Sequence, residues 1–122
     1  MALSDVSLAF AQEMQGLKID GMDLRMLRTF RVHKIDTAFV KAIRAENLAS
    51  ITARELVAFR IHDVTPGFVK AVRAQGFTPT GKQLVALKVH DVTPEYIAGL
   101  KKRGMERLTL DKVISLKIHG IG

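Results

Sequence analysis

Four histidines recur along the chain at nearly constant spacing, and this period limits what the chain can fold into. They are His33, His62, His90 and His119, which lie 29, 28 and 29 residues apart. Each stands in a phrase of the form basic–aliphatic–His–x–aliphatic. A period of this length is typical of repeat proteins, in which each repeat is one supersecondary unit that buries its apolar side by stacking on its neighbours. We therefore expect four tandem repeats in a single repeat domain, residues 1–122.

Further residue series keep the same phase and set the boundaries of the repeats. The aromatic series is Phe10, Phe39, Phe68 and Tyr96, and a second apolar series is Met14, Ile43, Val72 and Leu100. The repeats then span residues 4–32, 33–61, 62–89 and 90–118. Residues 119–122 begin a fifth repeat, which indicates either a longer array or a short terminal cap.

Each repeat carries two helix-start signals, so it should contain two short helices. The first signal is Ser7, Asp36, Thr65 and Thr93, and the second is Asp23, Thr52, Thr80 and Thr109. Side-chain oxygens at these positions accept from the unpaired amides of a first helical turn, and Thr52 with Glu55 and Thr80 with Gln83 match the capping box. We predict helices near residues 7–15, 23–33, 36–46, 52–62, 65–75, 80–90, 93–103 and 109–119. The predicted fold class is all-α, with two-helix repeats of about 29 residues stacked as a short α-solenoid or a compact repeat bundle.

The composition narrows the function classes. The chain has 122 residues and no cysteine, which excludes a disulfide framework and thiolate chemistry. No run reaches the ~18 apolar residues of a membrane span and no signal-peptide pattern is present, so we expect a soluble chain without membrane insertion, in a compartment left open. The serines and carboxylates form no catalytic motif, and there is no glycine-rich phosphate loop. We therefore expect a protein that is not an enzyme and has no catalytic residue and no cofactor.

Basic side chains are the main candidate for a binding surface. The chain has 19 lysines and arginines against 12 acidic residues, a formal charge of +7. Two sets keep the repeat phase: the second-helix basic series, Arg31, Arg60, Lys88 and Lys117, and the first-helix basic series, Arg44, Arg73 and Lys101. In a solenoid such positions align into rows that suit an acidic protein surface, an anionic lipid or a nucleic acid. The alternative is structural, because each position falls in a predicted last helical turn, where cations complement the helix dipole.

The histidines and the aromatic series each allow a functional and a structural interpretation. One histidine per repeat places neighbours a helix-packing distance of ~8–10 Å apart, whereas a metal needs its ligands at roughly 2 Å. We therefore expect no metal site and assign the histidines to the ends of the second helices, beside exposed carbonyls. The aromatic series shares the apolar stripe with the second apolar series, so we expect it in the core and not on a base-stacking surface.

Two phrases, His62-Asp63-Val64-Thr65-Pro66 and His90-Asp91-Val92-Thr93-Pro94, resemble a bacterial helical repeat. Its pattern is Leu-basic-aliphatic-His-Gly-Val-Thr-Pro-Glu-aromatic, and it occurs in sensor metallopeptidases of the BlaR kind and in anti-sigma-like proteins. The resemblance implies a bacterial regulatory or sensing system. The peptidase motif His-Glu-x-x-His does not occur in this sequence. We therefore expect a non-enzymatic module for protein–protein interaction or self-association, whose partner is another protein or a second copy.

A looser resemblance is to helix-hairpin-helix repeats, which bind DNA. In that family the backbone amides of the hairpin meet a phosphate, which requires small residues so that the backbone can approach. Here Asp63 and Asp91 bring negative charge to the hairpins, and only His119-Gly120-Ile121-Gly122 keeps the glycine pattern. The alternative function is therefore a helix-hairpin-helix-like protein that contacts the nucleic-acid backbone through its basic series.

Overall fold

The structure is a computed structural model that describes residues 8–105 and 107–120. Within these ranges the chain forms eight short α-helices and no strand beyond an isolated bridge between Asp20 and Thr52. The helices are α1 (Leu8–Gly16), α2 (Leu24–Val32), α3 (Thr37–Arg44), α4 (Ala53–Ile61), α5 (Pro66–Ala74), α6 (Gly81–Val89), α7 (Pro94–Lys102) and α8 (Leu110–Ile118). The all-α prediction is confirmed. None of these helices has the length and the apolar character needed to cross a membrane.

The helices begin where the capping pattern predicts, because the predicted side chains accept from first-turn amides. Asp23 accepts from the amide of Met26 at 2.8 Å, and Asp36 accepts from the amide of Phe39 at 2.8 Å. Threonine oxygens accept in the same way before the other helices: Thr52, Thr65, Thr80, Thr93 and Thr109. Both predicted capping boxes form, since Glu55 and Gln83 accept in return from the amides of Thr52 and Thr80. The remaining predicted cap, Ser7, lies outside the described residues.

The second helix of each repeat ends in a left-handed turn, which gives the histidine phrase its physical meaning. The histidine directly follows the helix. The backbone N–H of His33 donates to the carbonyl of Thr29, and the backbone N–H of Lys34 donates to the carbonyl of Arg31. The next residue has a positive φ in every repeat: Lys34 at 58°, Asp63 at 58°, Asp91 at 57° and Gly120 at 73°. Glycine and aspartate tolerate this backbone better than branched residues do. The turn then directs the second aliphatic residue of the phrase into the core, where Ile35, Val64 and Val92 are buried.

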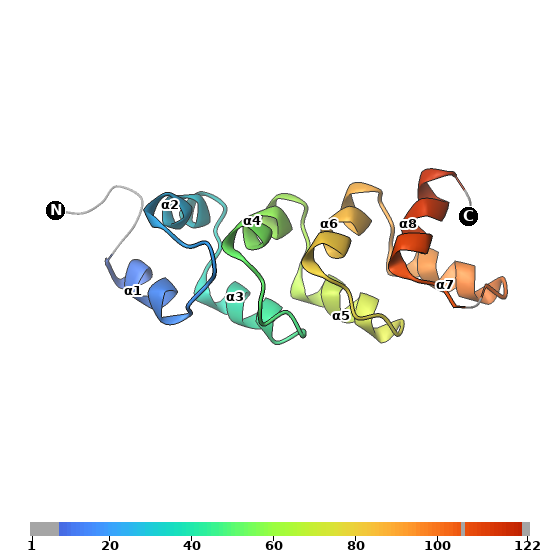
Figure 1. Ribbon diagram of the computed structural model, residues 1–122, viewed down its shortest axis with the longest axis horizontal. Coiled ribbons are helices and arrows are strands. Elements are labelled where there is room, and N and C mark those ends of the chain that lie inside the picture. The colour runs from blue at the N-terminus through green and yellow to red at the C-terminus, as the bar shows by residue number, and fades with distance from the viewer. Residues whose placement is uncertain (1–7, 106, 121–122) are drawn as a thin grey trace. The chain divides into compact units, whose positions relative to one another are not determined.

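Residue contacts divide the chain into two compact units, Met1–Ile61 and His62–Gly122, each of which contains two of the predicted repeats. In the first unit α1 and α3 form one layer, and α2 packs against α4 in a second layer (Figure 1). In the second unit α5 and α7 form one layer, and α6 packs against α8. We call α2, α4, α6 and α8 the even helices. Each unit therefore shows how one two-helix repeat stacks on the next.

Apolar residues spaced three or four apart on each helix form the core of each unit. Phe30, Ile43 and Phe59 are fully buried in the first unit. In the second unit the fully buried residues include Val72 and Leu84. Burial of one such side chain stabilises the fold by ~1.5–3 kcal/mol. Helices of eight or nine residues are only marginally stable alone in water, so they depend on this burial.

Candidate binding surface

The second-helix basic series packs against the aromatic series within each repeat. The cation lies 5.5 Å from the ring centroid for Arg31 over Phe10, 5.1 Å for Arg60 over Phe39, 4.5 Å for Lys88 over Phe68 and 4.9 Å for Lys117 over Tyr96. These distances are typical of cation–π contacts. The prediction that the aromatic series lies in the core was right for Phe10, which is buried, but wrong for the other three rings, which are half-buried. The cation covers the part of the ring that the core leaves open.

Arg60 also connects two repeats, because its side chain donates hydrogen bonds to carbonyls at the end of a helix in the preceding repeat. Its Nε donates to the carbonyl of His33 at 3.0 Å, and its Nη2 donates to the carbonyl of Lys34 at 3.3 Å. These carbonyls directly follow α2, and carbonyl groups at the end of a helix have no hydrogen-bond donor within that helix. The structural alternative for this arginine was that it complements the dipole of its own helix, and the structure shows hydrogen bonds to the end of the preceding even helix.

Two members of the first-helix basic series, Arg44 and Lys101, make the equivalent contact between first helices. Arg44 donates through Nη1 to the carbonyl of Leu17 at 2.6 Å, just beyond the end of α1. Lys101 donates through Nζ to the carbonyl of Gln75, which caps α5, and its ammonium lies 5.3 Å from the ring centroid of Phe77. Arg73 lies half-buried in the last turn of α5. In both units, therefore, predicted binding cations hold consecutive repeats together.

The histidines lie at the positions that the period predicts, one after each even helix. His62, His90 and His119 are exposed, and His33 is half-buried. Among residues 8–105 and 107–120, no group of three or more histidine or carboxylate side chains could hold a metal ion. The capping bonds at His33, His90 and His119 come from the backbone N–H.

An exposed aliphatic residue ends each even helix, and the sequence analysis did not single it out. This exposed aliphatic series has exposed fractions of 71% for Val32, 58% for Ile61, 54% for Val89 and 57% for Ile118. Each member directly precedes a histidine and directly follows a member of the second-helix basic series. The signal was present in the spacing, because Val32, Ile61 and Val89 each lie about 200° around the helix from a fully buried residue two positions earlier. An aliphatic side chain that recurs in phase on the outer side has no role in the core.

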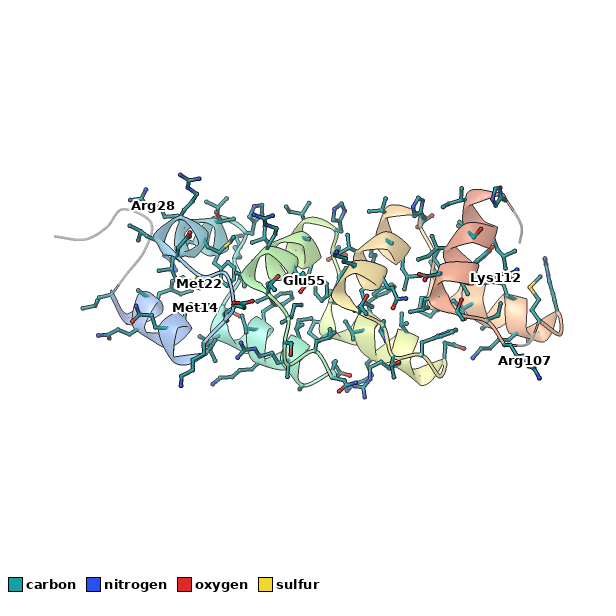
Figure 2. The ribbon with its side chains drawn as sticks, in the orientation of Figure 1. Met14, Met22, Arg28, Glu55, Arg107 and Lys112 are labelled. Atoms are coloured by element: carbon teal, nitrogen blue, oxygen red, sulfur yellow. The ribbon has the colours of Figure 1, made fainter. Side chains whose placement is uncertain are left out.

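The even helices are also strongly cationic. They carry nine basic residues and two acidic ones: Arg25, Arg28, Arg31, Arg54, Arg60, Lys82, Lys88, Lys112 and Lys117 against Glu55 and Asp111. Both acidic side chains accept hydrogen bonds within the protein, Glu55 from Thr52 in the same repeat and Asp111 from Gln83 in the preceding repeat. Arg28 points outward from α2 in Figure 2. In each unit, the exposed aliphatic series therefore lies on helices of strong positive charge.

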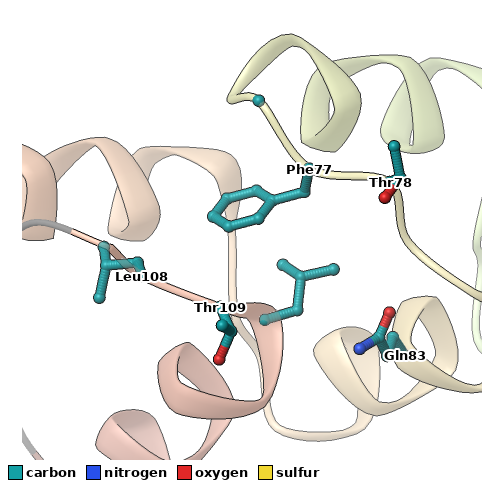
Figure 3. Close-up of a pocket in the computed structure, with 7 residues that line it drawn as sticks. Phe77, Thr78, Gln83, Leu108 and Thr109 are labelled. Atoms are coloured by element: carbon teal, nitrogen blue, oxygen red, sulfur yellow. The ribbon is translucent and has the colours of Figure 1, made fainter.

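A hollow between the two loops of the second unit offers no catalytic group. It has a volume of about 250 Å³ and lies where the segment after α5 faces the segment before α8 (Figure 3). Phe77, Thr78 and Gln83 line it from one repeat, and Leu108, Thr109 and Leu110 from the next. These are apolar side chains, hydroxyls and one amide, a lining that suits a junction between repeats and supplies neither an acid nor a base.

Comparison of the chain with family models, with curated proteins and with solved structures gives no match.

Proposed function

We propose that this protein is a non-enzymatic helical repeat module that binds another protein through its even helices, within a bacterial regulatory or sensing system. The observation that carries the proposal is the exposed aliphatic series. Four aliphatic side chains at equivalent positions are more than half exposed, although the same helices bury their other apolar side. Exposed apolar positions that recur on a charged surface are typical of interaction sites.

The chemistry of this surface indicates an acidic partner that also carries aliphatic side chains. Each aliphatic residue is preceded by a cation in the sequence, and the even helices hold nine basic and two acidic residues. In a partner segment with alternating aliphatic and acidic side chains, the aliphatic ones would pack against the exposed aliphatic series and the acidic ones would pair with the cations of the even helices. Complementary charge mainly raises the association rate, while buried apolar contacts supply most of the affinity.

Binding to the nucleic-acid backbone is the second candidate, and the excess of cations on the even helices favours it. The backbone amides of the hairpins argue against such binding, because they already donate hydrogen bonds within the protein. The amide of Ile35 donates to the carbonyl of Phe30 at 2.8 Å, and the amide of Val92 donates to the carbonyl of Leu87 at 2.7 Å. A phosphate held by the hairpin at Val92 would have to break this bond beside the carboxylate of Asp91.

The protein-binding proposal is tested by placing a charge in the exposed aliphatic series. Proteins that the immobilised wild-type chain retains from a lysate are identified. The protein that is retained most strongly is then purified, and its affinity for the chain is measured by titration calorimetry. Ile61→Arg should weaken this complex at least tenfold, because it puts a cation where apolar contact is needed. Leu8→Arg is the matched control, since Leu8 is 73% exposed and lies on α1, outside the even helices. Equal binding by both variants would contradict the proposal.

The nucleic-acid candidate has its own readout. If about four or five cations contact phosphates of a duplex, log K should fall with log[salt] with a slope near −4, from ~0.9 per phosphate. Arg60→Gln combined with Lys88→Gln would then flatten the slope by about two. We expect neither result, and we expect the purified protein to show no excess absorbance at 260 nm. Tight duplex binding at physiological salt that the double variant loses would make this candidate the leading one.

A further inference from the structure

The side of the first repeat that corresponds to a buried junction in the second repeat is less buried than that junction. Leu24 and Ala53 are the first residues of α2 and α4, so they occupy equivalent positions. Ala53 is fully buried, whereas Leu24 is 53% exposed. Ala11 and Val40 are equivalent on α1 and α3, and again the second is fully buried and the first is not. These positions of the first repeat are therefore less buried than their equivalents in the second repeat, and we call this side of the first repeat the leading face.

The leading face is hollow as well as apolar. A cavity of about 440 Å³ opens between α1 and α2. Its lining is apolar at Ala11, Met14, Ile19, Met22, Leu24 and Leu27 and polar at Gln15, Lys18 and Asp23. Met14 and Met22 lie between the two helices in Figure 2. Methionine side chains adapt to irregular surfaces, and a concave apolar face of this kind is suited to receive another packed element.

The junction between the first and second repeats shows what such a face binds in this fold. The amide of Ala53 donates to the carbonyl of Asp20 at 2.8 Å, in the loop that precedes α2. The side chains of Arg44 and Arg60 donate to the carbonyls of Leu17 and His33, at the ends of the two preceding helices. The occupant of the face is thus the trailing side of another repeat, with its helix ends and its inter-helix loop.

The trailing side of the fourth repeat has helix ends equivalent to those of the first repeat. Arg103 and His119 follow α7 and α8 as Leu17 and His33 follow α1 and α2, so their carbonyls are the equivalent acceptors. A hollow of about 190 Å³ on this repeat is lined by Glu95, Tyr96, Gly99, Leu100 and Arg103. On the leading face, Gln15 and Arg31 stand where the second repeat has the donors Arg44 and Arg60. Donors and acceptors therefore correspond at both ends.

We propose that the leading face binds the trailing side of the fourth repeat in a second copy of this chain, so that copies associate head to tail. This inference deepens the self-association part of the proposed function, and it uses a face other than the exposed aliphatic series. Such a contact is heterologous, which means that it can add further copies without closing. Assembly should therefore give a size distribution that grows with protein concentration.

Salt distinguishes this contact from binding to an acidic partner. Each chain carries a formal charge of +7, so two copies repel each other at low ionic strength. Salt screens this repulsion and leaves the apolar contact intact. Head-to-tail association should therefore strengthen between about 50 and 500 mM salt, whereas binding to an acidic protein or to nucleic acid should weaken over the same range.

A disulfide between copies provides the direct test. A Cβ atom placed at Gly21 would lie 3.9 Å from that of Ala53, a separation that fits the ~3.5–4.5 Å of a disulfide. Leu24 is equivalent to Ala53, and Arg107 precedes the cap Thr109 as Gly21 precedes Asp23. The chain contains no cysteine. Under mild oxidation, a mixture of Leu24→Cys and Arg107→Cys chains should form a covalent dimer of one copy each, at least tenfold more than either variant alone.

The controls separate this proposal from the proposed function. Val32→Cys mixed with Arg107→Cys should give only the background of either variant alone, because Val32 lies in the exposed aliphatic series. In sedimentation velocity, Leu24→Arg should remove the concentration-dependent species while Val32→Arg keeps them; both substitutions replace an exposed aliphatic residue by arginine. Loss of partner binding in Val32→Arg together with loss of self-association in Leu24→Arg would support both proposals separately. Equal yields from the two cysteine mixtures, or a monomeric wild-type chain at all salt concentrations, would overturn the head-to-tail proposal.

Discussion

Phe59 and Ile61 stand two residues apart on α4, yet they meet opposite environments. Phe59 is fully buried, and Ile61 is 58% exposed. The same contrast separates Phe30 from Val32 on α2 and Leu87 from Val89 on α6. Two residues correspond to about 200° around a helix, so the pair faces opposite sides. Recurrence in phase thus shows that positions are equivalent, but it does not show that they are buried. The even helices have one apolar side that packs in the core and exposed aliphatic residues on the opposite side.

The inner side should produce the largest loss of stability. Phe59→Ala removes a fully buried ring and leaves a cavity, so we expect it to lower the free energy of unfolding by ~3–5 kcal/mol. Urea denaturation followed by circular dichroism at 222 nm measures this loss. Phe30→Ala, at the equivalent buried position of the preceding repeat, should fall in the same range. A loss below about 1 kcal/mol at both positions would mean that the two sides of the even helices do not differ as the structure indicates.

Arg60 lies between the two sides, and its replacement should have an intermediate effect. Arg60→Met keeps the aliphatic stem but removes the hydrogen bonds to the carbonyls of His33 and Lys34 and the contact with the ring of Phe39. We expect a loss of about 1 kcal/mol in denaturant unfolding, the net value of such hydrogen bonds at an exposed site.

Arg54→Met is the control on the same helix. Arg54 is exposed in the first turn of α4, where a cation opposes the helix dipole, so its removal should leave stability unchanged or slightly raise it. Equal losses at Arg54 and Arg60 would show that net charge, and not the capping of α2, accounts for the effect.

A smaller effect is expected where a cation covers a half-buried ring. Lys88 lies 4.5 Å from the ring centroid of Phe68, and a double-mutant cycle of Phe68→Leu and Lys88→Met should give a coupling free energy of about 0.5–1 kcal/mol. Lys82, on the same helix, replaces Lys88 in the control cycle and should show no coupling to Phe68. Because the ring is half-buried, Phe68→Ala should cost less than Phe59→Ala. A coupling free energy near zero in both cycles would show that the cation–π contact does not stabilise the fold.

The features that the sequence predicted are those governed by local chemistry. Thr52 and Thr80 cap helices because a threonine followed three residues later by a glutamate or glutamine completes a capping box within one turn. The contact of Arg60 with the carbonyl of His33 joins residues in consecutive repeats, and only the way the repeats stack brings these groups together. The outer position of Ile61 could have been inferred from helical periodicity, because Ile61 lies about 200° around α4 from the buried Phe59.

The outer side should produce the smallest effect on stability, and this result ties the comparison to function. Ile61→Ser removes an aliphatic group that is already mostly in water, so the free energy of unfolding should change by no more than about 0.5 kcal/mol. Denaturant unfolding measures this change next to that of Phe59→Ala. A loss of about 2 kcal/mol or more would show that Ile61 belongs to the core and would withdraw it from the proposed surface. If stability holds and calorimetry shows weakened binding to the partner, recognition becomes the reason for an aliphatic residue at this exposed position. A serine at the end of α4 would fold equally well, so folding alone gives no account of the valine or isoleucine found there in all four repeats.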